Sequence, residues 1–135
     1  MAHNATTIAW IRGNPLFKSL SETAFTELVK HSTVETFTSG ELLIAQNSQN
    51  KSLYLITHGQ VKIIINDTEV DSQQAGETVG EISMSHFSPP VADVVADGDV
   101  ETVAFPMQVI DRLCAENTDF AAQLRKLGMK KVYDR

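Results

Sequence analysis

The chain has 135 residues, of which 42% are hydrophobic and 21% are charged, and its formal net charge is -6. A chain of this length forms one domain with a substantial buried core, and this composition excludes long disordered or collagen-like segments. The acidic balance argues against direct binding to nucleic acid, because contacts to phosphates require clustered Lys and Arg.

Apolar runs in the sequence stay shorter than the roughly 18 residues that span a bilayer. Residues 1–7 have neither the basic start nor the apolar centre of a signal peptide. We therefore expect a cytoplasmic protein. Cys114 is the single cysteine, which excludes an internal disulfide and a thiolate metal cluster. Its apolar setting in residues 109–115 indicates a small core residue of a helix, not a nucleophile.

The first predicted element is a helix that follows Ser21. Ser21 has the chemistry of an N-cap, Glu22 lies at the positive end of the helix dipole, and Lys30 lies at the negative end. The apolar side chains that share one face of this helix are Ala24, Phe25, Leu28 and Val29. The helix is therefore expected to pack against the rest of the domain through this face.

Between residues 33 and 105 the pattern is that of strands. Short stretches rich in Val, Ile and Thr alternate with Gly, Asn, Asp and Ser. This spacing favours a sandwich or a jelly-roll barrel over a parallel α/β sheet. The predicted strands are residues 33–37, 42–45, 53–57, 61–65, 69–73, 91–96 and 100–105. Asn66-Asp67 and Asp97-Gly98-Asp99 are predicted to be hairpin turns.

Helical patterns return after Pro106. One apolar face is formed by Val109, Ile110 and Leu113, and Thr118 is the predicted N-cap of a last helix. The order of the elements is therefore helix, barrel, two helices.

The last helix carries Phe120, Leu124 and Leu127 at the spacing i, i+4, i+7. This is more apolar surface than a short helix needs to dock on a barrel. We therefore expect the stripe to be exposed in part and to be covered by a partner or by a second copy of the chain.

Residues 76–94 contain the candidate ligand site. Gly80 permits a positive φ and lets backbone N–H groups approach an anion closely. A short helix that starts near Glu81 would direct the free N–H groups of Ile82 and Ser83 at a phosphate. The stretch therefore has the outline of a phosphate-binding cradle.

The same stretch resembles the phosphate-binding cassette of cyclic-nucleotide-binding domains, the family of the catabolite activator protein and the protein kinase A regulatory subunits. The family pattern is F-G-E-[LI]-A-L followed by P-R-x-A-x-V. Its glutamate accepts hydrogen bonds from the ribose, and its arginine pairs with the cyclic phosphate. The resemblance assigns the ribose contact to Glu81, but the arginine position falls on Pro90. The cassette residues that it implies as ligand-binding are Val79, Gly80, Glu81, Ile82, Ser83, Pro90, Val91 and Ala92.

Three further stretches, in the same order as in the family, support the resemblance, which covers residues 14–127. Residues 14–21 are similar to the family's P-L-F-x-x-L-s. Residues 40–46 and 52–63 are similar to G-E-x-[IL]-x-x-Q and x-[LM]-Y-[FIL]-[IV]-x-x-G-x-V-x-[IV]. The implied fold is mainly β with flanking α-helices, an antiparallel β jelly roll. Its expected parts, within one domain of residues 1–135, are a helical segment at 7–30, the jelly roll at 33–105 and C-terminal helices at 106–135.

The resemblance implies a non-catalytic regulatory module without a cofactor. In the family, ligand contact at the cassette moves the helices after the barrel. Loss of the arginine costs about 2 to 5 kcal/mol of binding free energy, so cyclic AMP or cyclic GMP is expected to bind weakly or not at all. The expected output is to a separate effector protein or to a second copy, without direct contact to nucleic acid and without membrane insertion.

A sensor that binds a cyclic nucleotide or another small metabolite in the modified cassette stays open as an alternative. The retained Gly80 and Glu81 favour it, and His86 or Lys62 would be the replacement cation. Glu81 has a second interpretation, in which it only complements the dipole of the cassette helix.

Two catalytic alternatives have less support in the sequence. A cupin-like metalloenzyme would need histidines at metal-binding spacing, whereas the histidines lie at positions 3, 31, 58 and 86. Ser83 or Ser85 with His86 and Asp93 supply the residue types of a hydrolytic triad, but no nucleophile elbow exposes the serine. We therefore predict no enzymatic activity and no metal site.

Overall fold

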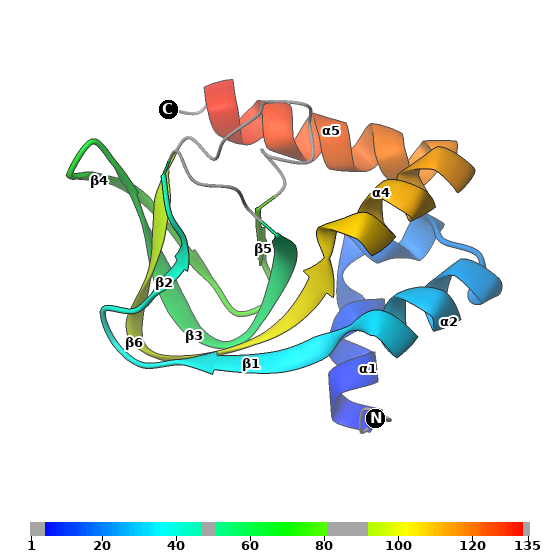
Figure 1. The fold of residues 1–135 in the computed structure, drawn as a ribbon, viewed down its shortest axis with the longest axis horizontal. Coiled ribbons are helices and arrows are strands. Elements are labelled where there is room, and N and C mark those ends of the chain that lie inside the picture. The colour runs from blue at the N-terminus through cyan, green and yellow to red at the C-terminus, as the bar shows by residue number, and fades with distance from the viewer. Residues whose placement is uncertain (1–4, 47–50, 81–91, 134–135) are drawn as a thin grey trace.

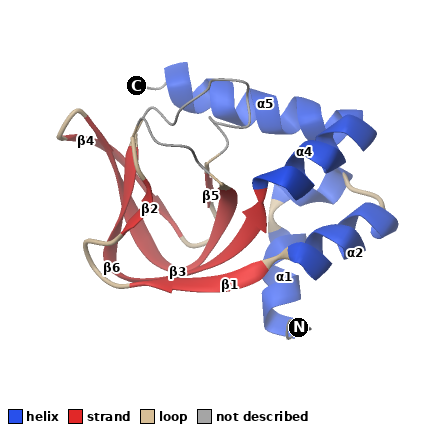
Figure 2. Ribbon diagram, viewed as in Figure 1, coloured by secondary structure: helices blue, strands red, loops and turns tan. Residues whose placement is uncertain are grey.

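A computed structural model describes residues 5–46, 51–80 and 92–133 of the chain. Figure 1 shows a curled sheet at one end of the molecule and a group of helices at the other, with α5 lying across the top. Figure 2 shows the same division by secondary structure. The predicted fold class, an antiparallel β-roll with flanking helices, is confirmed.

The helices are α1 (Ala5–Gly13), the 3-10 helix η1 (Pro15–Ser19), α2 (Glu22–His31), α4 (Met107–Glu116) and α5 (Thr118–Tyr133). The strands are β1 (Thr33–Phe37), β2 (Leu42–Ile44), β3 (Ser52–Ile65), β4 (Thr68–Gln74), β5 (Thr78–Val79) and β6 (Asp93–Pro106). No helix within the described ranges is long and apolar enough to cross a membrane.

The roll is built on the two long strands, β3 and β6. They pair antiparallel from Ser52 opposite Pro106 to Ile64 opposite Asp93. At one end of the pair β6 also pairs with β1, and at the other end with β2. β3 likewise pairs with β5 at one end and with β4 at the other. Because each long strand changes its outer neighbour along its length, the sheet curls into a roll (Figure 1).

The bend of this pair lies at Gly59. The β3–β6 register shifts on both sides of His58, and Gly59 has a φ of 88°. A Cβ atom at Gly59 would collide with the carbonyl oxygen of Asp99. The two predicted strands at 53–57 and 61–65 are therefore one strand, because glycine allows an irregularity that bends the ladder without ending it.

The predicted hairpin turn at Asp97-Gly98-Asp99 is wrong for the same reason. These residues lie inside β6, where Gly98 takes a φ of 82°. Positive φ at a single glycine supports a bulge as well as a turn. The other predicted turn is confirmed, since Asn66 and Asp67 have φ values of 49° and 66° between β3 and β4.

The helix predicted after Ser21 is confirmed as α2. The hydroxyl of Ser21 accepts a hydrogen bond from the Ala24 N–H at 3.1 Å, as an N-cap does. The expected face is buried through Ala24, Phe25 and Leu28. α4 likewise buries the predicted face of Val109, Ile110 and Leu113.

β3 separates two hydrophobic cores. Leu53 and Leu55 belong to the core between the roll and the helices, whereas Tyr54 and Ile56 belong to the core inside the roll. Successive side chains of a strand point to opposite faces. The continuous apolar run at residues 53–56 is therefore explained by a strand that is buried on both sides.

The apolar stripe of α5 is part of the helical core, so the expectation that it is exposed is wrong for Phe120 and Leu124. Their exposed fractions are 0% and 1%. Phe120 stacks on Phe17 of η1, with 6.1 Å between the ring centroids. Leu127 is half-buried against the same core. The pattern of α5 alone does not show that Phe17 of η1, which lies within the helical segment predicted at 7–30, packs against this stripe.

α5 begins at Thr118 itself, so Thr118 is a helical residue and not the predicted N-cap. Asn117 precedes it and donates a side-chain hydrogen bond to the Leu113 carbonyl at 3.0 Å. Cys114 packs against the helical core, and burial raises the pKa of its thiol. A protonated thiol of this kind agrees with the predicted role as a small core residue.

We predict that Gly59→Ala destabilises the protein by about 3 kcal/mol or more, because a strained positive φ and overpacking each cost about 1 to 3 kcal/mol. Gly40→Ala is the matched control, since Gly40 has a φ of 91° and open space around its Cβ position. It should lose only the conformational part, about 1 kcal/mol. Urea denaturation of the two variants measures the difference, and equal losses would contradict the proposed contact with Asp99.

Candidate functional site

The described cassette residues lie where β5 ends and just before β6 begins. Val79 ends β5 opposite Tyr54, and Gly80 follows it with a φ of 107°. Val79 and Ala92 are both buried in the core inside the roll. The structure thus brings together Val79, Gly80 and Ala92. The other predicted ligand contacts, Glu81, Ile82, Ser83, Pro90 and Val91, lie outside the described residues.

The wall beside the cassette is apolar. The side chains of the inner core that form it include Leu43, Ile44, Ile56, Val61, Ile63 and Val94. Tyr54 is part of this wall, and its ring meets that of Phe37 at a centroid distance of 6.0 Å. Burial raises the pKa of the Tyr54 phenol, so this hydroxyl stays uncharged at neutral pH.

Lys62, one of the two suggested replacement cations, does not face this wall. Its neighbours Val61 and Ile63 both point into the roll. Strand alternation therefore puts the Lys62 side chain on the outer face. His86, the other suggestion, lies outside the described residues.

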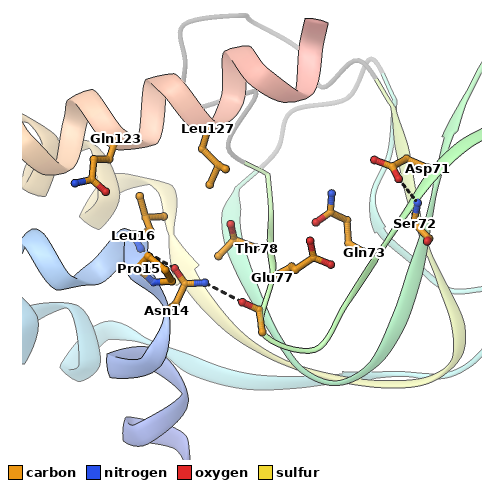
Figure 3. Close-up of a pocket in the computed structure, with 11 residues that line it drawn as sticks. Asn14, Pro15, Leu16, Asp71, Ser72, Gln73, Glu77, Thr78, Gln123 and Leu127 are labelled. Carbon is orange, nitrogen blue, oxygen red and sulfur yellow. Dashed lines mark hydrogen bonds between the residues drawn. The ribbon is translucent and has the colours of Figure 1, made fainter. Parts of the chain in front are cut away.

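A pocket of about 440 Å³ opens between β4, β5 and α5 (Figure 3). Its lining residues are Asn14, Pro15, Leu16, Asp71, Ser72, Gln73, Gly76, Glu77, Thr78, Gln123 and Leu127. Most of these side chains offer hydrogen-bonding groups, and Leu16 and Leu127 add apolar surface. The volume falls within the range of about 300 to 1,000 Å³ typical of small-molecule sites.

Asn14 braces one end of the pocket. Its side-chain oxygen accepts a hydrogen bond from the Leu16 N–H at 2.8 Å, and its Nδ2 donates to the Gly76 carbonyl at 2.9 Å. The Gly76 N–H in turn donates to the Ile56 carbonyl at 2.8 Å. Asn14 therefore ties η1 to the turn before β5 and, through it, to β3.

Glu77 and Gln73 lie side by side in the close-up (Figure 3). The carboxylate of Glu77 accepts a hydrogen bond from the Gln74 N–H at 2.9 Å, which closes the turn between β4 and β5. Gln73 is 7% exposed and pairs in register with Val61 of β3. Directly opposite residues share a face of the sheet, so Gln73 lies on the inner side of the roll.

Of these pocket residues, Gly76, Glu77 and Thr78 lie in the predicted ligand stretch 76–94, and sequence patterns indicated none of the others as ligand contacts. A signal existed for Asn14, because Asn before Pro is a recognisable helix start. Gln73 and Gln123 carried no signal, since their roles depend on β4 and α5 meeting across the fold. The short strand β5, which contains Thr78 and directly follows Glu77, was also not predicted.

Metal chemistry finds no geometric support in the described part of the chain, and of the candidate triad residues only Asp93 lies within it, since Ser83, Ser85 and His86 lie outside the described residues. No group of three His, Cys, Asp or Glu side chains within it could hold a metal ion. His31 contacts Glu27 at 3.0 Å and His58 contacts Glu101 at 3.2 Å, in separate places on the surface. The Asp93 carboxylate accepts a hydrogen bond from the Gln46 N–H at 2.6 Å, so it fixes the backbone two residues after the end of β2.

A sequence model described as cyclic nucleotide-binding domain matches residues 34–117. The cAMP-dependent protein kinase regulatory subunit of Candida albicans is 28% identical over 108 residues, covering 80% of this chain and 24% of that protein. The corresponding subunit of Blastocladiella emersonii is 24% identical over 129 residues, covering 92% of this chain and 32% of that protein. The chain thus spans about a quarter to a third of the length of these relatives.

Solved structures share the fold. The regulatory domain of Toxoplasma gondii PKA with cAMP superposes with a TM-score of 0.80 at 18% identity, covering 97% of this chain and 50% of that one. A similar likeness holds for the regulatory subunit of a cAMP-independent protein kinase A from Trypanosoma brucei, with a TM-score of 0.77 at 21% identity and coverage of 94% and 50%. At such identities the likeness establishes the fold alone.

We predict that Asn14→Ala lowers the free energy of unfolding by about 2 kcal/mol, because it removes a cap worth about 1 kcal/mol and leaves a part-buried carbonyl without its donor. Asn14→Ser keeps a capping oxygen but is too short to reach Gly76, so it should lose about half as much. Urea denaturation measures both variants. An Ala variant as stable as the wild type would show that the brace contributes nothing.

Proposed function

Because this chain belongs to the cyclic nucleotide-binding domain family, we propose that it acts as a non-catalytic regulatory module. The roll would hold the ligand site, and the C-terminal helices would pass its state to a separate effector protein. The observation that carries this proposal is the helical core. Leu55 and Phe105 of the roll pack in one cluster with Ile110 of α4 and Phe120 of α5.

The kind of partner follows from the relatives. The Candida and Blastocladiella proteins are regulatory subunits of a kinase. We infer that an effector of this chain, whether a kinase or another enzyme, would be contacted through the exposed side of the C-terminal helices. A second copy of the chain is the other candidate partner. With Phe120 and Leu124 buried, a contact between copies would use exposed residues such as Arg125 and Lys126.

We infer that the family's phosphate contact is weakened in this chain. Pro90 occupies the arginine position of the cassette pattern, and Lys62 faces away from the roll. Among the described residues, no Lys, Arg or His side chain is buried. A cyclic phosphate held there would have no described counter-charge, and an uncompensated buried charge is costly.

A relative offers a parallel. The Trypanosoma brucei protein is named cAMP-independent, and its form bound to cAMP in the A site carries glutamate-to-alanine, threonine-to-arginine and valine-to-alanine substitutions. We take this as support for the proposal that an added arginine matters for nucleotide binding in this fold.

A second candidate function is a sensor for another small molecule. The specific observation in its favour is Gly80, which keeps a positive φ at the start of the cassette. A conformation that only glycine adopts readily suits a close approach of backbone to a ligand. Titration of the purified chain separates the two candidate functions.

We predict that cyclic AMP binds far more weakly than micromolar. Loss of the arginine pair at about 2 to 5 kcal/mol weakens a site by roughly 30-fold to several thousand-fold. Calorimetric titrations with cyclic AMP, cyclic GMP and cyclic di-GMP measure this. A dissociation constant of a few micromolar or below for cyclic AMP would contradict the proposal and would require another cation.

We predict that Pro90→Arg raises the affinity for cyclic AMP at least about tenfold, because a guanidinium restores charge and bidentate geometry together. Pro89→Arg is the matched control, since it adds the same charge one residue away from the arginine position. If Pro90→Arg folds normally and binds no better than the wild type and the control, the cassette does not form a phosphate cradle.

A further inference from the structure

Strand β1 forms an open edge of the sheet. Within the described residues β1 pairs only with β6, and β6 pairs with β3 on its other side (Figure 1). The outer edge of β1 therefore presents backbone N–H and C=O groups that no described strand pairs. An edge of this kind is a template on which another strand can pair.

Soluble proteins usually protect an edge strand with lysine, proline, other charges or an irregular register. The opposite edge strand, β4, has such protection. Its pairing with β3 contains a register shift between Ile63 and Ile64, and Glu69 and Asp71 add charge. β1 contains no Lys, Arg or Pro, and its register with β6 is regular over all 5 residues. β1 is thus the less protected of these two edges.

The same side of the roll exposes apolar side chains. Val34 of β1 is 46% exposed, and Leu42 of β2 is 50% exposed. Both strands pair with the side of β6 that faces away from β3. Burial of such side chains against an added strand gives hydrophobic stabilisation besides the backbone hydrogen bonds.

We propose that β1 pairs antiparallel with β1 of a second copy of the chain, so that the two rolls share one continuous sheet. A two-fold axis relates the two identical strands, and one residue of β1 then lies opposite its own copy. The one charged residue of β1, Glu35, decides which residue this is.

Three registers are possible around the middle of β1. With Glu35 at the centre, two carboxylates would lie directly opposite each other, which destabilises a sheet. With Thr36 at the centre, Glu35 would lie opposite Phe37 of the second copy and lose solvation. With Val34 at the centre, two valines lie opposite each other and Glu35 lies opposite Thr33. Thr33 already donates a hydrogen bond to Glu35 within β1 at 3.3 Å, so its hydroxyl suits this carboxylate.

Charges beyond the strand ends also favour the register centred on Val34. This register brings Lys30, which is exposed in the last turn of α2, toward Thr38 of the second copy, since both lie equally far from Val34 along the chain. The carboxylate of Glu41 accepts hydrogen bonds from the N–H and the hydroxyl of Thr38 at 2.6 and 2.8 Å. Opposite charges would therefore meet at each end of the strand pair.

This surface is separate from the candidate ligand site and from α5. Binding through β1 needs no ligand, and it leaves the C-terminal helices free to contact an effector. The inference therefore goes beyond the proposed regulatory function and does not depend on it. The competing arrangement is association through α5, where Arg125 and Lys126 are exposed.

The test is sedimentation equilibrium of the full chain between about 10 µM and about 1 mM. A single strand pair buries less than the roughly 1,000 Å² of a stable interface, so we expect a reversible dimer with a dissociation constant of about 100 µM. The ¹⁵N amide resonances of residues 33–38 should shift with protein concentration. Because the ion pairs are exposed, raising the salt concentration from about 0.05 M to about 0.5 M should weaken the dimer about threefold.

Two matched valine substitutions locate the contact. Val34→Lys places a lysine on the open edge and should raise the dissociation constant at least about tenfold. Val70→Lys makes the same change at a valine that is 42% exposed on β4, and it should leave association unchanged. Lys30→Glu should also weaken the dimer. Adding Glu41→Lys to Lys30→Glu should restore part of the affinity, since opposite charges face each other again.

Other results would overturn the proposal. A chain that stays monomeric at about 1 mM does not pair through β1. Equal losses in Val34→Lys and Val70→Lys would show non-specific association, and a dimer lost in Arg125→Glu but kept in Val34→Lys would place the contact on α5. Urea denaturation shows whether Val34→Lys is folded; if it is not, wild-type residues 33–38 without concentration-dependent shifts would overturn the proposal. A monomeric chain would leave the cyclic AMP titrations unaffected, so this failure is distinct from failure of the proposed function.

Discussion

The fold depends on the close approach of β3 and β6 at Gly59. The two strands are long enough to pair throughout, but a straight ladder of that length would give an open, unbent pair of strands and no interior. The absence of a side chain at Gly59 lets the backbone meet Asp99 directly, and the register shifts there bend both strands together. The outer strands then pair with different ends of the bent ladder. This bend determines the positions of the inner core, of Gly80 after β5 and of the pocket beside β4.

The fold could be predicted because its signals are local or repeated. Several signals each predict a structure from a few neighbouring residues. They are the Ser21 cap, the inward face of α2, the Asn66-Asp67 turn and the apolar run at 53–56. The predictions were wrong where contacts between residues that are distant in the sequence determine the structure. Gly59 and Gly98 look like turn residues in sequence, and only their pairing across the ladder makes them bends within a strand. The stripe of α5 looks like an interface, and only the position of Phe17 makes it a core.

The candidate site shows the same difference between residues with a local sequence signal and residues that only the fold brings together. The cassette could be recognised in the sequence because its residues are contiguous. The pocket residues come from the η1 loop, from β4, from the turn before β5 and from α5, and no local pattern relates Asn14 to Gly76 or Gln73 to Gln123. A polar residue in a predicted strand is ambiguous in sequence, because the same residue type occurs both at inward positions and on exposed edge strands. Burial of Gln73 resolves the ambiguity, and burial is a property of the whole fold.

The two-sided burial of β3 bears on how such a domain changes over time. Leu53 and Leu55 serve the helices, while Tyr54 and Ile56 serve the inside of the roll. Substitutions on one face leave the chemistry of the other face intact, so the face inside the roll can change while the face beneath the helices stays the same. A domain built on this strand can change the inside of its roll without changing the core beneath its helices. Lineages of such domains are therefore expected to diverge faster inside the roll than beneath the helices.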